Sequence, residues 1–426
     1  MHPFLQRLMH NPTFRKKVGL LSGLIVLLMV LVLVLTWGKD LDERHRPVEF
    51  AEAFDFSVGT FADYTAYSER RLRAAHTEAP AEVITNLAPF RMEPLPECPA
   101  SATATYRNGI VLTHDLLDSP YVLRELGMYF QKRCFLVYGL LLPDHGTQPG
   151  DLLDADWETW VAAERMAVQD LATHVDNVYL GGHGAGGTLA ILEASGNAGV
   201  DGLVLLAPLL DNTLNSFGNM AGTALGWLVP GARWSQVVPV YTPYRFESIP
   251  YHLASETNAL IEAMQIALPT RPFEVPVFMV ASEDDEVVKP ETILAWMGER
   301  IHPLSHTMFF SRQPQEPKPG ISYFNSYAPE LTLIGVSHPG LPVPLNDPEF
   351  GWNGRSMDCA HYFHSDQDAY GRCMAGERTF QGAITPEGLA AGLLERIEFN
   401  YFYREMMIAL DAFISPVTPV PSMLEL

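Results

Sequence analysis

The chain has 426 residues, with 50 Asp and Glu against 28 Lys and Arg, for a formal net charge of −22. This acidity argues against nucleic-acid binding, because neutralising phosphates needs clustered cations. Hydrophobic residues make up 47% and charged residues 18% of the sequence, which is a globular rather than a disordered composition.

The first predicted element is a membrane anchor. Residues 18–37 are apolar and uncharged, and their run is about as long as a helix needs to cross a ~30 Å hydrocarbon core. Cations precede this run and no acid does. The positive-inside rule then leaves residues 1–17 as a cytoplasmic tail. The rest of the chain is expected in a periplasm or extracellular space, with the bacterial inner membrane favoured.

A cleaved signal peptide is the alternative interpretation of this run. Two features argue against it: the run is long for a signal peptide, and Thr36-Trp37-Gly38-Lys39 is not a small-x-small cleavage site. An uncleaved anchor remains our expectation.

Beyond the anchor, residues 38–107 are predicted to be a stalk and lead-in. Short apolar runs then alternate with segments of helical spacing, in two parts at 108–207 and 275–415. Strands that alternate with helices predict an α/β fold, with a mainly parallel sheet and helices on both faces. The expected strands are 109–113, 134–142, 177–180, 202–207, 275–280 and 331–335, and the expected helices are 121–131, 157–172, 188–194 and 386–414.

Two insertions interrupt this alternation. Residues 208–274 are apolar and predict a helical cap over the carboxyl edge of the sheet, where ligands bind in such folds. Residues 339–383 form a long loop after the last expected strand, and residues 416–426 form a tail.

The four cysteines allow three pairings. An oxidising compartment favours disulfides. Cys359 and Cys373 are close in sequence, and Cys98 and Cys134 flank segments expected on neighbouring strands. We therefore expect the disulfides Cys98–Cys134 and Cys359–Cys373, with free buried thiols as the alternative.

The most informative segment runs from Val178 to Thr188 and has the pattern of a strand, a sharp turn and a helix. In a nucleophile elbow of the form G-x-S-x-G, a serine sits on the turn and the flanking glycines allow tight strand–helix packing. Gly182 and Gly186 stand at the flanking positions and His183 precedes the centre. The centre itself is Gly184 instead of serine.

With its neighbours, this segment resembles the α/β-hydrolase superfamily, and specifically the membrane-anchored bacterial branch near serine aminopeptidases, monoacylglycerol lipases and carboxylesterases. Five motifs in the family's order carry the resemblance over roughly residues 60–415. Besides the elbow they are His114-Asp115-Leu116-Leu117-Asp118-Ser119-Pro120, Leu142-Pro143-Asp144-His145-Gly146-Thr147-Gln148-Pro149-Gly150-Asp151-Leu152, Ser282-Glu283-Asp284-Asp285-Glu286-Val287-Val288 and Val336-Ser337-His338-Pro339.

The resemblance implies the α/β-hydrolase fold and assigns positions to a catalytic site. Asp285 would be the acid and His338 the base of a nucleophile–acid–histidine triad. The backbone N–H groups of Ala185 and Leu116 would form the oxyanion hole. No cofactor and no metal are implied.

Three departures from the family pattern bear on activity. Gly184 has no Oγ, so no acyl-enzyme can form there. Asp115 replaces a glycine beside the oxyanion hole, where a carboxylate would oppose the negative charge that develops on a substrate oxygen. Asp144 replaces another family glycine in a loop expected near the site.

These departures favour a degenerate hydrolase that binds a lipid, acyl or peptide-like ligand, or a protein partner, at a membrane surface. The alternative is an active hydrolase in which His338 and Asp285 activate water. A metal-assisted variant would draw on Asp115, Asp144, His145, His183 and His338. An engineered or misread Gly184 in an ordinary serine hydrolase is the remaining interpretation.

Overall fold

The computed structural model describes residues 12–36, 39–99, 101–196, 199–211, 229–268, 275–299, 302–316 and 318–415. Several predicted segments fall partly or wholly outside the described residues. They are the amino-terminal tail at 1–11, the end of the anchor at 37–38, the cap at 212–228 and 269–274, and the carboxyl-terminal tail at 416–426.

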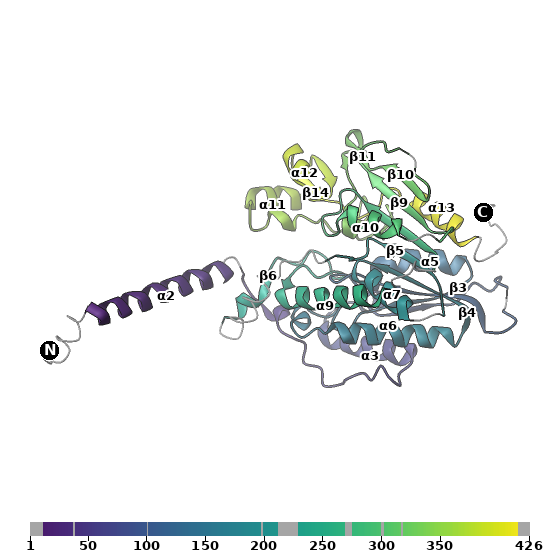
Figure 1. Cartoon of the computed structure of the whole chain (residues 1–426), viewed down its shortest axis with the longest axis horizontal. Helices are drawn as coiled ribbons and strands as arrows, with labels where there is room; N and C mark the ends of the chain where they lie inside the picture. Colours follow the sequence, from purple (N-terminus) through teal and green to yellow (C-terminus); the bar gives the residue numbers. More distant parts are fainter. Residues whose placement is uncertain are drawn as a thin grey trace.

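A central sheet of eight strands, in the order β1-β3-β2-β4-β5-β8-β9-β10, organises the domain (Figure 1). β1 is antiparallel to β3, and the other neighbours are parallel. Every residue of β3 and β8 is buried, as expected for parallel strands that are covered on both faces. The strands are β1 (Phe90–Met92), β2 (Tyr106–Thr113), β3 (Phe135–Leu140), β4 (Val175–His183), β5 (Val200–Leu206), β8 (Val277–Ser282), β9 (His306–Ser311) and β10 (Ile321–Asn325).

Helices cover both faces of this sheet, as the alternation of elements predicts. α6, α7 and α9 contact one another on one face. α5 and α13 lie together on the other face, where the hydroxyl of Tyr129 donates to Asp411 over 2.6 Å. The helices are α2 (Pro12–Thr36), α3 (Phe61–Ala75), α4 (Ala81–Leu87), α5 (Arg124–Lys132), α6 (Trp157–Ala172), α7 (Ala185–Gly196), α9 (Tyr251–Ala267), α10 (Pro290–Gly298), α11 (Gln367–Met374), α12 (Pro386–Ala391) and α13 (Tyr403–Ile414).

The segment predicted as a stalk and lead-in belongs instead to the packed domain. α3 begins after Thr60, whose hydroxyl accepts from the N–H of Asp63 over 3.2 Å and so caps the helix. Its apolar face buries Phe61 and Leu72 in the core, and β1 adds an edge strand to the sheet. The composition of this segment does not reveal that its apolar residues pack against the rest of the domain.

Two expectations for the carboxyl-terminal half were wrong. The expected sixth strand at 331–335 is β12 (Leu333–Ile334), which belongs to a separate four-stranded sheet with β11 (Tyr327–Ala328), β13 (Phe380–Gly382) and β14 (Leu394–Arg396). The expected helix at 386–414 is divided into α12, β14 and α13. The main sheet is completed by β9 and β10. We did not expect β10, because its half-exposed residues lack a buried apolar run.

The remaining pair of strands lies in the described part of the cap, where β6 (Trp234–Gln236) pairs with β7 (Ile249–Pro250). β7 leads directly into α9, which contacts α6 and α7. The described cap residues therefore pack onto the helical layer of the core.

α2 includes most of the predicted anchor and projects from the domain in Figure 1. Its apolar side chains are exposed, among them Leu20, Leu24 and Met29. When only the described residues are considered, the chain has no helix that is both long and apolar enough to cross a membrane. The structure thus does not support the predicted transmembrane helix.

Both predicted disulfides are confirmed. Cys98 is bonded to Cys134 and Cys359 to Cys373. The first bond joins the lead-in to the start of β3, and the second closes the long loop around α11.

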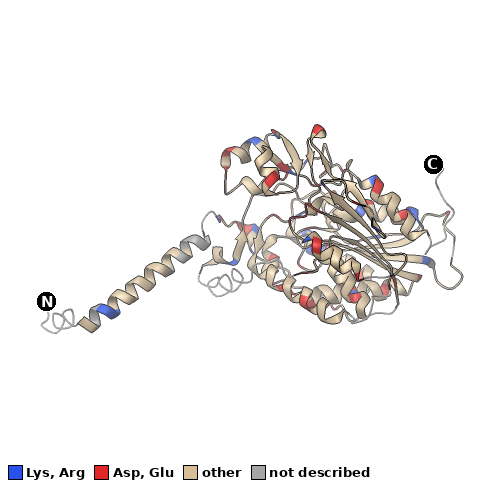
Figure 2. Cartoon of the chain, turned by 45° about the horizontal axis from the view of Figure 1, so that its top comes forward, with Lys and Arg blue, Asp and Glu red and all other residues tan. Residues whose placement is uncertain are grey.

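Charged residues lie mainly on helices and loops, and the strands of the central sheet carry few (Figure 2). Acidic and basic positions are interspersed over the view in Figure 2, without a basic stripe. This distribution is that of a solvated surface.

Candidate active site

The turn between β4 and α7 has the backbone of a nucleophile elbow. Gly184 adopts φ +51°, in the left-handed region that favours glycine. A Cβ at Gly182 would lie 2.2 Å from the carbonyl carbon of Gly186, and one at Gly186 would lie 2.0 Å from the carbonyl oxygen of Thr113. The flanking glycines therefore permit the tight strand–helix packing that the sequence predicts.

The carboxylate of Asp115 occupies the place of the missing side chain at Gly184. A Cβ built at Gly184 would lie 2.0 Å from Oδ1 and 2.2 Å from Cγ of Asp115. Strand register explains the approach, because Thr113 at the end of β2 pairs with Gly182 near the end of β4. Asp115 lies two residues after Thr113, and Gly184 lies two residues after Gly182, so the two residues come together beyond the carboxyl ends of β2 and β4.

One oxygen of Asp115 also occupies the backbone N–H group that was predicted to form the oxyanion hole. Oδ1 accepts a hydrogen bond from the backbone N–H of Ala185 over 2.7 Å. Leu116, the other predicted donor residue, follows Asp115 in the same loop and is buried. We expected Asp115 to oppose charge on a substrate oxygen, but we did not foresee that its own carboxylate would occupy the hole.

The second oxygen of Asp115 faces the predicted base. Oδ2 of Asp115 is 3.3 Å from Nε2 of His338, and Nδ1 of His338 is 2.8 Å from Oδ2 of Asp285. The backbone N–H groups of Val287 and Val288 donate to the other Asp285 oxygen, over 2.8 and 2.7 Å, and fix its orientation. The structure thus contains the predicted pair of Asp285 and His338, extended by Asp115 where a serine would stand.

Two carboxylates control the charge of His338. Burial by itself lowers its pKa, but the charges of Asp285 and Asp115 and the hydrogen bonds to them outweigh burial and raise the pKa to about 10. For Asp115, burial raises the pKa, while the hydrogen bond and charge of His338 bring it below its ordinary value. At neutral pH Asp115 is therefore a carboxylate and His338 an imidazolium.

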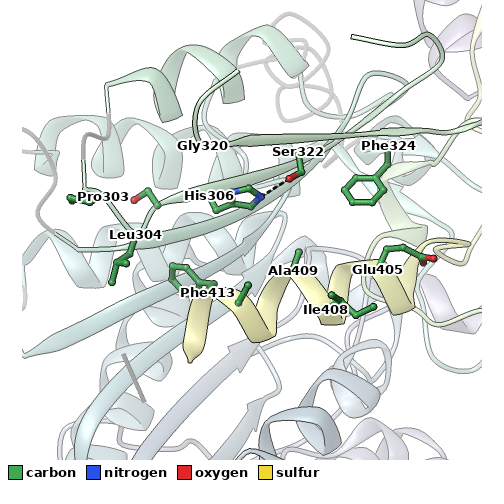
Figure 3. A pocket seen from close by; sticks show the side chains of 12 residues that line it. Pro303, Leu304, His306, Gly320, Ser322, Phe324, Glu405, Ile408, Ala409 and Phe413 are labelled. Atoms are coloured by element: carbon green, nitrogen blue, oxygen red, sulfur yellow. Dashed lines mark hydrogen bonds between the residues drawn. The ribbon is translucent and has the colours of Figure 1, made fainter. Parts of the chain in front are cut away.

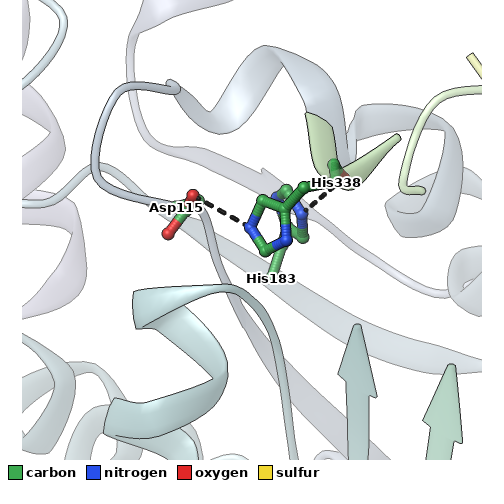
Figure 4. A group of neighbouring side chains, drawn as sticks. All are labelled: Asp115, His183 and His338. Carbon is green, nitrogen blue, oxygen red and sulfur yellow. Dashed lines mark hydrogen bonds and ion pairs between the residues drawn. The ribbon is translucent and has the colours of Figure 1, made fainter. Parts of the chain in front are cut away.

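His183 lies next to this row in the interior (Figure 4). Its side chain is fully buried, and its Nε2 is 3.0 Å from the carbonyl oxygen of His338. Its Nδ1 is 3.4 Å from Oδ2 of Asp118, but without the geometry of a hydrogen bond. His183 thus contributes to the site itself as well as to the packing of the elbow.

The structure does not bring Asp144 to this cluster. Its carboxylate accepts from Arg71 of α3 over 2.8 Å, and the same guanidinium binds Asp151 over 2.9 Å. Nδ1 of His145 is bound to the carbonyl oxygen of Pro143 over 2.8 Å. The expectation that Asp144 alters the site is therefore wrong. Its carboxylate is bound instead by the guanidinium of Arg71, which lies on α3 in the segment predicted to be a stalk.

His114 has a structural role in the Asp115 loop. Its Nδ1 is 2.7 Å from the carbonyl oxygen of Asp115, and its Nε2 accepts from the N–H of Leu142 over 3.0 Å. Burial, assisted by the nearby His145, lowers the pKa of His114 to about 3, so the ring is neutral. A neutral ring with both nitrogens bonded orients the backbone that carries Asp115.

Sequence reasoning missed a buried arginine that supports the site. Arg245, from the described part of the cap, forms ion pairs with Asp118 and Glu398, and all three side chains are buried. The available signal was weak: Arg245 is one of three arginines in the otherwise apolar insertion at 208–274, and a buried arginine requires anionic partners.

A groove of about 630 Å³ lies away from this cluster, between β9, β10 and α13 (Figure 3). It is lined in part by His306, Phe324 and Ile408. The Asp115 cluster lies instead beyond the carboxyl ends of β2 and β4. The groove is thus a separate feature at the edge of the sheet.

Taken together, the mainly parallel sheet, the elbow between β4 and α7, and the acid and histidine that follow it in the chain define the α/β-hydrolase fold. No family model matches the chain. A thermostable monoacylglycerol lipase of Bacillus sp. strain H-257 is 22% identical over 186 residues, which cover 43% of this chain and 72% of that lipase.

Two solved structures are also similar. The monoacylglycerol lipase of Paleococcus ferrophilus is 17% identical with a TM-score of 0.42, and the match covers 68% of this chain and 98% of that chain. A soluble variant of the monoglyceride lipase of Saccharomyces cerevisiae, in complex with a substrate analogue, is 11% identical with a TM-score of 0.40, over 52% of this chain and 81% of that chain. At such values the topology of this chain itself carries the assignment of the fold.

Proposed function

We propose that this chain has lipase or esterase ancestry and has lost covalent ester hydrolysis. The observation that carries the proposal is the position of the Asp115 carboxylate, which fills the place of the nucleophile's side chain and accepts from the N–H of Ala185. A serine hydrolase needs both an Oγ and a free oxyanion hole, and residual catalysis of ~10³–10⁴-fold over water after loss of a triad member depends on that hole and on substrate binding. Because Asp115 fills the oxyanion hole, even this residual catalysis is disfavoured.

The alternative in which His338 activates water is less well supported. A general base must be unprotonated at the working pH. The pKa of His338 is raised to about 10 by Asp285 and Asp115 despite burial, so the ring carries a proton at neutral pH. Its Nε2 also faces Asp115 rather than an open position.

We propose an acyl or lipid-like molecule as the ligand of this degenerate hydrolase. The support is the similarity to a monoacylglycerol lipase and the apolar character of the insertion at 208–274. A peptide-like ligand or a protein partner is the alternative. Photo-crosslinking of the full chain with a diazirine fatty acyl ester separates these outcomes, because only the first predicts saturable labelling.

We also propose that the apolar run at 18–37 anchors the protein in a membrane, with the main domain outside the cytoplasm. The supporting features are the uncharged run at 18–37, the cations before it, and the exposure of Leu20 and Leu24. If the proposal holds, the full chain stays in membranes after carbonate extraction and a variant without residues 1–38 does not. Release of both proteins would contradict it.

The loss of covalent catalysis can be tested directly with a fluorophosphonate probe and a short-chain aryl ester. The full chain in detergent should show no labelling above that of a heat-denatured sample and no hydrolysis above that of the Asp285→Asn variant. Stoichiometric labelling of the native protein, mapped to any side chain of the site, would overturn the proposal.

A further inference from the structure

Three side chains that can ligate a metal converge beside Gly184. Asp115, His183 and His338 each offer one ligand atom, and these atoms all lie within 4.8 Å of one another (Figure 4). Oδ2 of Asp115 and Nε2 of His338 are 3.3 Å apart. Two ligands of one tetrahedral Zn²⁺, each at ~2.0–2.1 Å from the ion, stand about 3.3 Å apart. This pair therefore already has the spacing of two ligands on one ion.

His183 supplies an independent sign that a cation belongs here. A carbonyl oxygen only accepts, so Nε2 of His183 must donate its proton to the carbonyl of His338, over 3.0 Å. In a neutral ring Nδ1 then carries a lone pair. This atom is buried and has no hydrogen-bond partner among the described residues, and a carboxylate oxygen of Asp118 lies 3.4 Å away. Two electron-rich atoms at this separation require a positive charge between them, which either a proton on Nδ1 or a bound cation can supply.

Each of the three side chains is also held by an outer partner. Nδ1 of His338 is bonded to Asp285 over 2.8 Å, and Oδ1 of Asp115 accepts from Ala185 over 2.7 Å. Nε2 of His183 donates to a backbone carbonyl. Metal-binding histidines characteristically use their second nitrogen in this way, and the outer partner fixes the tautomer and ring orientation.

We propose that Asp115, His183 and His338 bind one divalent transition-metal ion. Two imidazoles and one carboxylate suit Zn²⁺ or Co²⁺, whereas Ca²⁺ and Mg²⁺ need more oxygen ligands. The Asp115 side chain is 15% exposed while those of the two histidines are buried, so a fourth ligand would reach the ion from the Asp115 side. Any side chain at 184 would displace Asp115, which gives Gly184 a role in the site.

The test uses the full chain in detergent, freed of metal with a chelator and then titrated with Zn²⁺ and Co²⁺. We expect one ion per chain by calorimetry, d–d absorption bands of tetrahedral Co²⁺, and no Ca²⁺ binding. His183→Gln and His338→Gln should each weaken binding at least ~100-fold, and the outer-partner variant Asp285→Asn ~10–100-fold. His306→Gln is the matched control, because His306 is a half-buried histidine bonded to Ser322, away from the site.

Two results would overturn the proposal. One is the absence of stoichiometric binding by the wild-type chain, which would mean that protons alone supply the positive charge at His183 and His338. The other is adventitious binding, shown by equal affinity in His338→Gln and His306→Gln. If His338→Gln does not fold, the metal affinity of the Asp285→Asn variant and the Co²⁺ spectrum of the wild type still test the proposal. The loss of covalent catalysis is judged separately, by fluorophosphonate labelling.

Discussion

Oδ1 of Asp115 lies 2.7 Å from the backbone nitrogen of Ala185, so a side chain of the protein holds the N–H group that the family resemblance assigns to a substrate oxygen. The carboxylate is an anion in an anion-binding position, and His338 on its other side supplies a counter-charge. The oxyanion-hole donor is therefore occupied without a substrate. This arrangement differs from an ordinary loss of a serine, which would leave the oxyanion hole open.

Restoring the serine alone should not restore the enzyme. In Gly184→Ser the new Cβ would meet Asp115 at 2.0 Å, so the carboxylate must move and the strained φ of +51° must accept a side chain. We expect a loss of about 1–3 kcal/mol of stability and ester hydrolysis near background. The double variant with Asp115→Gly should hydrolyse aryl esters faster than either single variant. Full activity of Gly184→Ser by itself would contradict this account of Asp115.

The charge on His338 should make stability fall towards alkaline pH. The folded pKa of about 10 is above the ordinary value of 6.5, so the stabilisation is complete below about pH 6.5 and is lost as pH rises through about 10. Asp285→Asn should lower the folded pKa of His338 and so reduce the loss of stability between pH 6.5 and 10. Urea unfolding from pH 6 to 10 would measure the free energy of unfolding, with the folded pKa of His338 followed by NMR of the imidazole.

The wild type must be compared with Asp285→Asn because other buried acids act in the same direction. Burial raises the pKa of Glu164 and the pKa of Glu247 to about 8, so their ionisation also removes stability as pH rises. Identical pH dependences for the wild type and Asp285→Asn would show that His338 is not charged by its carboxylates.

Removing Arg245 should be strongly destabilising. Asp118 and Glu398 would remain buried without their counter-ion, at an expected loss of about 3–5 kcal/mol for Arg245→Met. Arg70→Met is the matched control, because the side chains of Arg70 and its partner Glu52 are both more than half exposed and the pair should contribute about 0–1 kcal/mol. Denaturant unfolding of both variants gives the difference, and equal losses would argue against the buried network.

The two disulfides should differ in their effect on stability. Their sequence separations are 36 for Cys98–Cys134 and 14 for Cys359–Cys373. On the chain-entropy account, removal of the first by paired Cys→Ser substitutions should cost about 4 kcal/mol and removal of the second about 3 kcal/mol. Thermal unfolding with and without reductant measures both. A larger loss for the Cys359–Cys373 variant would indicate that native packing, rather than the entropy of the unfolded chain, sets the order.

Most of the core sheet could be predicted because its buried parallel strands are continuous apolar runs between helical segments. β10 could not, since its half-exposed residues do not have that pattern, and the apolar run at 331–335 does not say which sheet it joins. β9 was not predicted either, although all of its residues after His306 are buried. α3 was taken for part of a stalk because an amphipathic segment does not reveal the surface against which it packs.

The amino-acid sequence by itself determined the pattern of the elbow and the absence of a nucleophilic oxygen at Gly184, because these follow from residue identity and order. It also led us to expect the pair of Asp285 and His338 and both disulfides, and the tertiary structure confirmed them. The tertiary structure alone decided where charged side chains point. Asp144 is bound by Arg71, whereas Asp115 is brought to Gly184 because β2 and β4 pair in a register that aligns Thr113 with Gly182. A carboxylate goes to the nearest donors and cations, and their positions depend on contacts between segments far apart in the chain.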